Sequence, residues 1–273
     1  MGAGSRSADH AGRRFRRYPK DWDTEGIFYN KTYFAAHHIQ IPANLTWNPV
    51  NGGSFLALAR QATFDNPAGI AALQSLMNLS LKDQLAPPAS EYGSNGAAST
   101  NQDVALFTAG KVAMDVEGDW FTQTIDTQAK FSFGVLPIPT GPDGRWSFTN
   151  GLIDAINVHS PNQTAAWELE QWLGSPASEK IMGSGGYVWP GIASIDSTFL
   201  DYWKAKDIDV SPFLAEAENS SNVETLPVAP QAGQVIVSLA SDLGPAWLGD
   251  EPAAKAVATA AKDANQELQH PSP

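Results

Sequence analysis

Two carboxylates and an indole stand together in Glu117-Gly-Asp-Trp120, and these residue types suit ligand recognition. An indole ring stacks on the apolar C–H face of a sugar, while a carboxylate accepts hydrogen bonds from hydroxyl groups. Glu117 and Asp119 also suit a glycosidase acid and nucleophile, because carboxylates two apart on a strand share a face at about 6–7 Å. No further acidic cluster accompanies them, so binding is favoured over catalysis. A core Trp beside a helix-capping Asp is the structural alternative.

The residues around this corner predict the elements that position it. Asn101 is expected to cap a short helix through Phe107, and Gly110 suits a left-handed exit from that helix. Apolar residues at 112, 114 and 116 then alternate with Lys111, Ala113 and Asp115, which is the period of a half-buried strand. A helix-compatible segment, 121–127, follows. Carboxylate and indole are therefore placed at a strand-to-helix turn, where open α/β sheets usually present ligand sites.

Helices and strands alternate along the rest of the chain, which predicts the α/β class. Asn66-Pro67 and Ser175-Pro176 each have an N-cap residue followed by Pro at the first helical position. Ser160-Pro161 predicts another helix, which Gly174 closes. Further helices are expected over 228–243 and 252–268, and strands over 131–135 and within 146–158.

Several segments follow one another in a distinctive order. They are 20–34 (KDWDTEGIFYNKTYF), 46–47 (TW), 64–70 (FDNPAGI), 107–120 (FTAGKVAMDVEGDW), 133–139 (FGVLPIP) and 150–156 (NGLIDAI). Their order over 18–268 resembles that of the extracellular solute-binding proteins of bacterial ABC sugar importers, family 1, the maltose-binding-protein type. The segments 20–34 and 150–156 resemble crossing strands between two lobes.

The resemblance implies a periplasmic-binding-protein-like type II fold, with two lobes joined by crossing strands. Family members have a substantial α/β segment ahead of the first crossing and a longer insert between Thr63 and Phe64, so we expect an N-terminal truncation, an internal deletion and an incomplete first lobe. The expected division is a disordered or non-native extension, a lobe 1 remnant and a lobe 2. These are residues 1–17, residues 18–28 with 147–187, and residues 29–146 with 188–270.

The resemblance also implies the function. We expect the substrate-binding component of a bacterial ABC importer, which binds a carbohydrate in the inter-lobe cleft and delivers it to a membrane permease by lobe closure. Such a protein is no enzyme, needs no cofactor or metal, and is extracellular or periplasmic. A stand-alone carbohydrate-binding or interaction module, or a non-functional remnant of a binding protein, is the alternative.

Ligand contacts are expected at the crossings and corners, where lobes face each other. Trp22 and Asp23 stand just ahead of the first crossing strand, Asn150 lies at the second crossing, and 185–190 resembles a glycine-rich third crossing. Asp119 takes a place where many family members have Pro. The predicted site residues are Trp22, Asp23, Asp119, Trp120, Asn150, Tyr187 and Trp189. Aromatic rings and carboxylates suit a neutral mono- or oligosaccharide, while polyamine-like or amino-sugar ligands stay open.

Composition excludes other partners. The formal net charge of −12 argues against nucleic acid and anionic membranes. Cysteine is absent, which excludes disulfides, thiolate metal sites and a lipid-anchoring thiol. Residues 1–17 are rich in Arg and lack an apolar core, so no secretory signal is visible there. His37 and His38 are adjacent and point apart on a helix, so a metal site is not expected.

Overall fold

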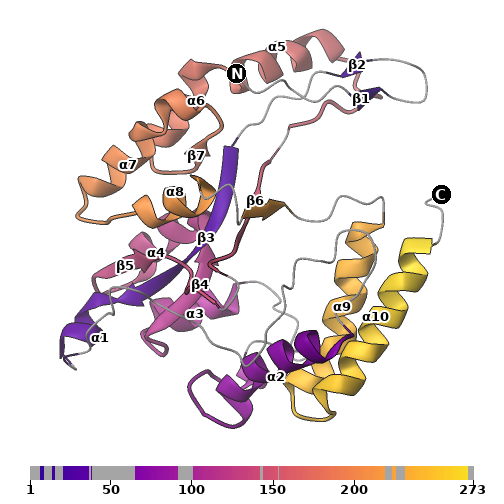
Figure 1. The fold of residues 1–273 in the computed structure, drawn as a ribbon. Helices are drawn as coiled ribbons and strands as arrows, with labels where there is room; N and C mark the ends of the chain where they lie inside the picture. The colour runs from indigo at the N-terminus through magenta and orange to yellow at the C-terminus, as the bar shows by residue number, and fades with distance from the viewer. Residues whose placement is uncertain are drawn as a thin grey trace.

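The structure, a computed structural model, describes residues 7–8, 14–15, 21–36, 38, 65–91, 101–141, 144–152, 154–218, 223–225 and 231–269. Its central element is one long strand, β3 (Asp21–Asn30), which runs through the middle of the molecule (Figure 1). Trp22 and Asp23 lie within this strand and not ahead of it as predicted, because the strand begins at Asp21.

Four strands pair with β3, and they divide between its two ends. At the N-terminal end β7 (Trp189–Pro190) and β6 (Ser147–Asn150) pair with residues 21–24. At the other end β4 (Met114–Gly118) and β5 (Phe133–Leu136) pair with residues 25–30. All four are antiparallel to β3, and β8 (Val223–Thr225) adds to β6 in parallel. A single strand therefore belongs to two strand groups, as a crossing strand must.

Helices surround this sheet, and one further strand pair was not predicted. Ser7–Ala8 (β1) pairs with Arg14–Phe15 (β2) in an antiparallel ladder. The helices are α1 (Lys31–Ala36), α2 (Pro67–Leu81), η1 (Ala89–Glu91), α3 (Gln102–Thr108), η2 (Asp119–Phe121), α4 (Thr122–Gln128), α5 (Gln163–Leu173), α6 (Pro176–Ser184), η3 (Ala193–Ile195), α7 (Ser197–Lys204), α8 (Ser211–Glu218), α9 (Ala232–Trp247) and α10 (Ala253–Gln269).

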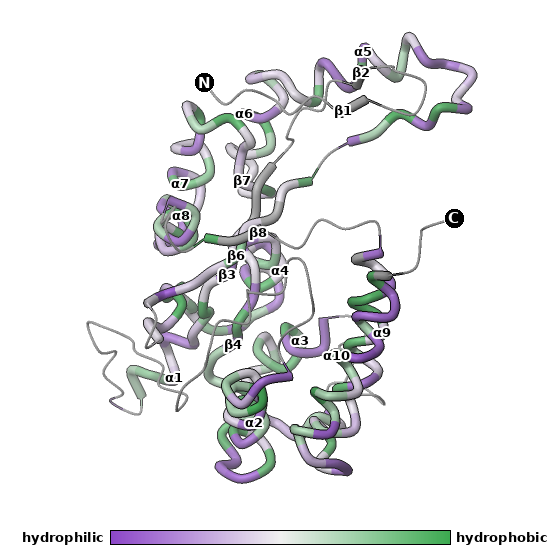
Figure 2. The backbone as a smooth tube through the Cα atoms, turned by 45° about the vertical axis from the view of Figure 1, so that its right-hand side comes forward, coloured by the Kyte–Doolittle hydropathy of each residue, from purple (hydrophilic) through white to green (hydrophobic). Residues whose placement is uncertain are grey.

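Two hydrophobic cores hold these elements. In the first, Phe28 of β3 is fully buried, with ring centroids 5.7–6.4 Å from those of Phe107, Phe133 and Phe213. This core also takes in buried side chains of α4 and α7. The second core lies between α2, α9 and α10, where small alanine side chains of α10 let the helices approach closely. Figure 2 shows α9 and α10 side by side, with α2 against them.

Local capping signals confirm two of the predicted helix starts. The Asn66 side chain accepts hydrogen bonds from the N–H groups of Ala68 and Gly69, both at 3.0 Å. Ser175 caps α6 in the same way through the Ser178 N–H. At the end of α3, Gly110 has φ +72°, as its left-handed exit requires.

Two predicted caps were wrong in detail. Asn101 does precede α3, but its φ of 56° is left-handed and its side chain makes no capping bond, so the helix starts without the predicted cap. Helix α5 begins at Gln163 rather than directly after Ser160-Pro161, because Ser160 instead accepts a bond from the Asn162 N–H in a turn ahead of the helix.

Strand β4 has the predicted alternation with an unexpected orientation. Its apolar side chains Met114 and Val116 are more than half exposed, at 53% and 56%. Asp115 and Glu117 are the half-buried ones. The cause is the register: Phe28 stands opposite Asp115 and Gly26 opposite Glu117, so both acids share the face that packs on the first core. Carboxyl groups therefore lie where hydrophobic patterning predicts apolar ones.

Candidate ligand-binding site at the crossing strands

The strand register brings most of the predicted site positions together. Along β3, Trp22 is paired with Trp189 of β7, and Asp23 with Asn150 of β6. Two residues further, Glu25 is paired with Gly118, which directly precedes the Asp119–Trp120 corner. Positions far apart in sequence thus meet on four consecutive residues of one strand. For Trp22, Asp23 and Asn150 the structure describes the backbone, and their side-chain roles stay predictions.

The corner itself is a short 3₁₀ turn that leads from β4 into α4. Trp120 is 37% exposed, and its ring lies directly over Gly118: a Cβ added to Gly118 would be 2.0 Å from the indole. Only a glycine leaves room for the ring there. The Thr122 hydroxyl donates to the Asp119 carbonyl at 2.7 Å, which fixes the turn at the start of α4. The indole is therefore held against the strand with part of its surface open to a ligand.

A second aromatic side chain is held close to this corner. The Gln123 amide donates to the carbonyl of Gly185 at 3.1 Å, which ties α4 to the turn after α6. In that turn Gly186 has φ +65°, and a Cβ there would collide with the Tyr202 ring, so this position demands glycine. Tyr187 follows and is 53% exposed. Trp120 and Tyr187 thus offer aromatic surface from two linked elements.

Two predicted contacts are buried. Trp189 is completely buried in the first core, with its ring centroid 4.7 Å from that of Phe199. Asp119 is only 4% exposed. Both side chains thus lie away from solvent in this structure, and a ligand role for Trp189 and Asp119 stays a prediction. Residue type alone did not separate the buried Trp189 from the exposed Trp120.

Glu25 is a candidate that the sequence analysis missed. Residues directly opposite in a strand pair share a face, so Glu25 lies on the face of β3 and β4 that the Trp120 ring covers at Gly118. Burial raises the pKa of Glu25 to about 7. The signal that would have found it is the acid at every second position in Asp21-Trp-Asp-Thr-Glu25, since alternate strand residues share a face.

Carboxyl groups gather on the other face of β4. Burial raises the pKa of Asp115 to about 6, with a further rise from the charge of Asp103. Burial also raises the pKa of Glu117 to about 8; the Gly118 N–H opposes this rise, while Asp103 and Asp115 add to it. These groups therefore hold protons at a pH where ordinary carboxyls have lost theirs.

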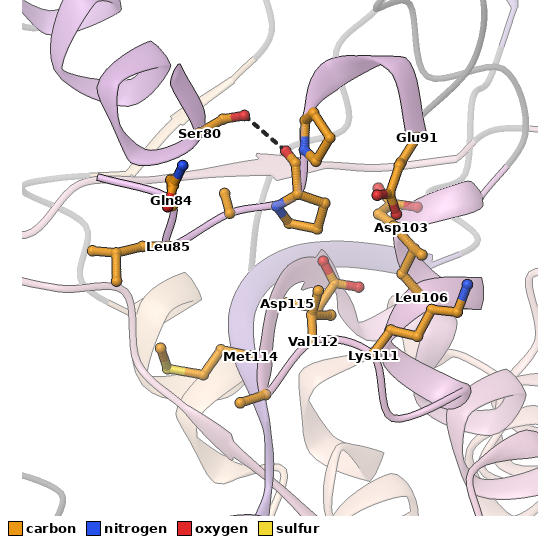
Figure 3. A pocket seen from close by; sticks show the side chains of 14 residues that line it. Ser80, Gln84, Leu85, Glu91, Asp103, Leu106, Lys111, Val112, Met114 and Asp115 are labelled. Carbon is orange, nitrogen blue, oxygen red and sulfur yellow. Dashed lines mark hydrogen bonds between the residues drawn. The ribbon is translucent and has the colours of Figure 1, made fainter. Parts of the chain in front are cut away.

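A pocket of about 670 Å³ opens beside these acids, between the α2–η1 connection, α3 and the start of β4 (Figure 3). Asp115 projects from β4 into it, and Asp103 and Glu91 lie together at one wall. Among the lining residues that the structure describes, Lys111 is the one basic side chain. Lining residues 111–115 belong to the opposite end of β4 from the Trp120 corner, so this pocket is separate from the crossing-strand site.

Within the ranges that the structure describes, no group of three or more His, Asp or Glu residues is arranged to hold a metal ion. None of the helices in those ranges has the length and apolarity of a membrane span.

One strand thus pairs with two strand groups, and exposed aromatic side chains lie near the point where it crosses between them. The chain matches the sequence profile of bacterial extracellular solute-binding proteins over residues 5–180, and it belongs to that family. The predicted family is confirmed. None of the curated proteins matches the chain at the sequence level.

Solved structures confirm the fold. UspC of M. tuberculosis is 24% identical with a TM-score of 0.71, and the match covers 95% of this chain and 76% of UspC. The ABC substrate-binding protein Lmo0181 of Listeria monocytogenes, in complex with cycloalternan, is 17% identical with a TM-score of 0.76, covering 94% and 72%. Maltose-bound MalE3 of T. maritima is 16% identical with a TM-score of 0.74, covering 95% and 74%. The chain thus spans about three quarters of each of these longer proteins.

Proposed function

We propose that this protein is the substrate-binding component of an ABC importer and binds a carbohydrate beside its crossing strands. It would act outside the cytoplasmic membrane and deliver the ligand to a membrane permease. The observation that carries the proposal is the meeting of the Trp22, Asp23 and Asn150 positions on neighbouring strands, next to the exposed rings of Trp120 and Tyr187. Structural neighbours bound to maltose and cycloalternan support a carbohydrate.

Closure of two lobes is the proposed mechanism. We place residues 18–28 and 147–187 in the first lobe, and 29–146 and 188–270 in the second. The pairing of β3 with β6 and β7 at one end, and with β4 and β5 at the other, supports a change of lobe along this strand. A ligand that contacts both lobes binds the closed state better and shifts the population toward it.

Binding without chemistry is part of the proposal. A glycosidase needs two carboxyl groups that both face the substrate. Here Asp119 is buried at the start of η2, whereas Glu117 lies on the strand face that packs against the first core. This arrangement favours a binding protein over a hydrolase.

A thermal-shift screen tests the proposal directly. Maltose, maltotriose, glucosamine and spermidine are each added to the purified protein at several concentrations. We expect one of the glycans to raise the melting temperature by several degrees, because a ligand that binds only the folded state stabilises it. A cooperative melt that none of the sugars shifts, or a shift by spermidine alone, would reject a carbohydrate-binding role.

One observation favours the alternative of an interaction module. Helix α5 contains no buried residue, and Leu169 and Trp172 on its apolar side are 56% and 50% exposed. Amphipathic helices normally bury such a stripe. Size-exclusion chromatography with light scattering distinguishes the two roles, since an interaction module would self-associate or bind a protein while leaving every sugar unbound.

A further inference from the structure

The exposed rings of Trp120 and Tyr187 are held in the same way. The Trp120 ring lies over Gly118, where an added Cβ would be 2.0 Å from the indole. The Tyr187 ring lies over Gly185, where an added Cβ would be 2.2 Å from a ring carbon. Each ring thus packs on the glycine two residues before it and stays partly exposed. The backbone at these two glycines therefore sets where the two rings lie.

Tyr187 belongs to the C-terminal cap of α6. The Gly186 N–H donates to the Gly183 carbonyl at 2.9 Å, and the Tyr187 N–H donates to the Met182 carbonyl at 3.2 Å. Because Gly186 is left-handed, with φ +65°, these two bonds form a cap that commonly ends a helix. Neither bond uses the Gly185 carbonyl, which stays available to a donor from another element.

Gln123 of α4 supplies that donor. Its side-chain amide donates to the Gly185 carbonyl at 3.1 Å. Gln123 lies in the first turn of α4, three residues after Trp120, so one short segment carries the first ring and holds the backbone beneath the second. In the proposed division of lobes, Gln123 belongs to the second lobe and Gly185 to the first. The bond therefore also joins the two lobes.

A second set of contacts connects α4 to the same turn. Lys206, which follows α7, forms an ion pair with Asp126 of α4, and its Nζ lies 5.2 Å from the centre of the Tyr202 ring. The Tyr202 ring in turn fills the space beside Gly186, where an added Cβ would be 2.2 Å from it. Gln123 and Asp126 are three residues apart and share one face of α4. This face thus reaches the turn after α6 both directly and through Tyr202.

We propose that Gln123 is a positioning residue for ligand recognition, which fixes the Tyr187 ring relative to the Trp120 ring so that both contact the same ligand. This inference rests on the proposed function for its ligand, whereas the hold on the Tyr187 ring is a property of the protein alone. Without the amide, the link from α4 depends on the partly exposed ion pair of Lys206, and such pairs contribute little. The Tyr187 ring then varies in orientation, and ordering it on binding costs affinity.

Variants on one helix separate the hydrogen bond from packing. Gln123→Met keeps an unbranched side chain of the same length without a donor. Gln123→Glu keeps the shape of the amide but places an acceptor against the Gly185 carbonyl. Gln128→Met makes the same change at the exposed end of α4 and serves as the matched control. Loss of one hydrogen bond should lower the melting temperature by only a few degrees, so we expect all three variants to fold.

The first readout needs no ligand. Tyrosines are replaced by 3-fluorotyrosine, and the ¹⁹F signals of Tyr187 and Tyr33 are each identified by their absence in a Tyr→Phe variant. We expect the Tyr187 signal to shift or broaden in both Gln123 variants and to keep its position in Gln128→Met. The signal of Tyr33, on α1, should stay unchanged throughout. A Tyr187 signal that ignores the Gln123 variants overturns the proposal, as does an equal shift of Tyr33.

The second readout is maltotriose affinity by calorimetry, arranged as a double-mutant cycle with Tyr187. If Gln123 acts through the Tyr187 ring, Gln123→Met should weaken binding about fivefold in the native background, but less than about twofold when Tyr187→Ala is already present. Gln128→Met should bind as the native protein does. Equal effects of Gln123→Met in the two backgrounds contradict the positioning role. If maltotriose gives no heat with the native protein, the carbohydrate proposal fails, while the ¹⁹F signals still decide whether Gln123 holds the ring.

Discussion

At the scale of single residues, recognition depends on how a few side chains are held rather than on which side chains are present. Trp120 and Trp189 are the same residue type, yet one is 37% exposed and the other fully buried. The difference arises from long-range packing, since Trp189 is enclosed by Phe199 of α7. Sequence patterning could predict that both lie near the crossing strands, but not which one faces solvent.

Trp120→Ala should weaken ligand binding by more than tenfold and leave the fold intact, because it removes a partly exposed ring from the corner. Calorimetry with the glycan that raises the melting temperature measures the loss. Trp172→Ala is the control, since Trp172 is likewise partly exposed, at 50%, but belongs to α5. Equal affinity of the Trp120 variant and the native protein would remove this ring from the site.

At the scale of elements, the features that could be predicted are those set by interactions between residues close in sequence, such as helix caps. Asn66 and Ser175 cap their helices as expected, because the groups they satisfy lie two or three residues away. The orientation of β4 was not predictable in this way. Its acids face inward because β3, more than eighty residues earlier in the chain, sets the register. Helix and strand positions thus follow from local sequence, whereas the choice of buried face does not.

Besides Phe213 in the first core, helix α8 has one buried acid that makes polar contacts with the segment between β5 and β6. Glu216 is 1% exposed, accepts a hydrogen bond from the Ile138 N–H at 3.1 Å, and lies 3.3 Å from the Arg145 guanidinium. Burial raises the pKa of Glu216, and the charge of Arg145 and the Ile138 N–H oppose that rise.

Glu216→Ala should lower the free energy of unfolding by roughly 2–4 kcal/mol, because it leaves a buried N–H and an Arg without their partner. Urea denaturation measures the change. Glu218→Ala, an exposed acid on the same helix, should cost less than about 0.5 kcal/mol. Similar losses in the two variants would show that the buried contacts of Glu216 contribute little.

At the scale of the whole molecule, the fold class and family were predictable because ordered segments along the chain resemble those of a known family, and the profile match over residues 5–180 bears this out. The crossing of β3 between strand groups also follows that expectation. The concentration of half-buried acids around β4 was not foreseen. Because burial raises the pKa values of these acids, the folded protein binds protons more tightly than the unfolded chain does.

This proton affinity predicts how stability depends on pH. Glu25, Asp115 and Glu117 have folded pKa values of about 7, 6 and 8, above the 3.8–4.5 of ordinary carboxyls. The folded state therefore binds more protons than the unfolded state between about pH 4.5 and pH 8, so stability must fall as pH rises through this range. The melting temperature measured from pH 4.5 to pH 8.5 should decrease accordingly.

A charge-matched comparison isolates these groups. The double variant Glu25→Gln/Glu117→Gln should melt higher than the native protein at pH 8 and much closer to it at pH 4.5. Glu168→Gln/Glu218→Gln removes the same formal charge from exposed positions and should keep the native pH profile. If both double variants reduce the pH dependence of the melting temperature equally, general charge repulsion causes that dependence and the buried carboxyls do not.

The long reach of β3 also sets the order in which the chain can fold. Trp22 of β3 and its paired residue Trp189 of β7 are roughly 170 residues apart in the sequence. These two strands therefore cannot pair until most of the chain has been made. At a synthesis rate of about 5–20 residues per second, β3 leaves the ribosome some ten to thirty seconds before β7 does. During this interval residues 21–22 of β3 lack their β7 partner. A newly made chain would therefore be most vulnerable to aggregation in that time, and slow formation of non-local pairs should limit its folding rate.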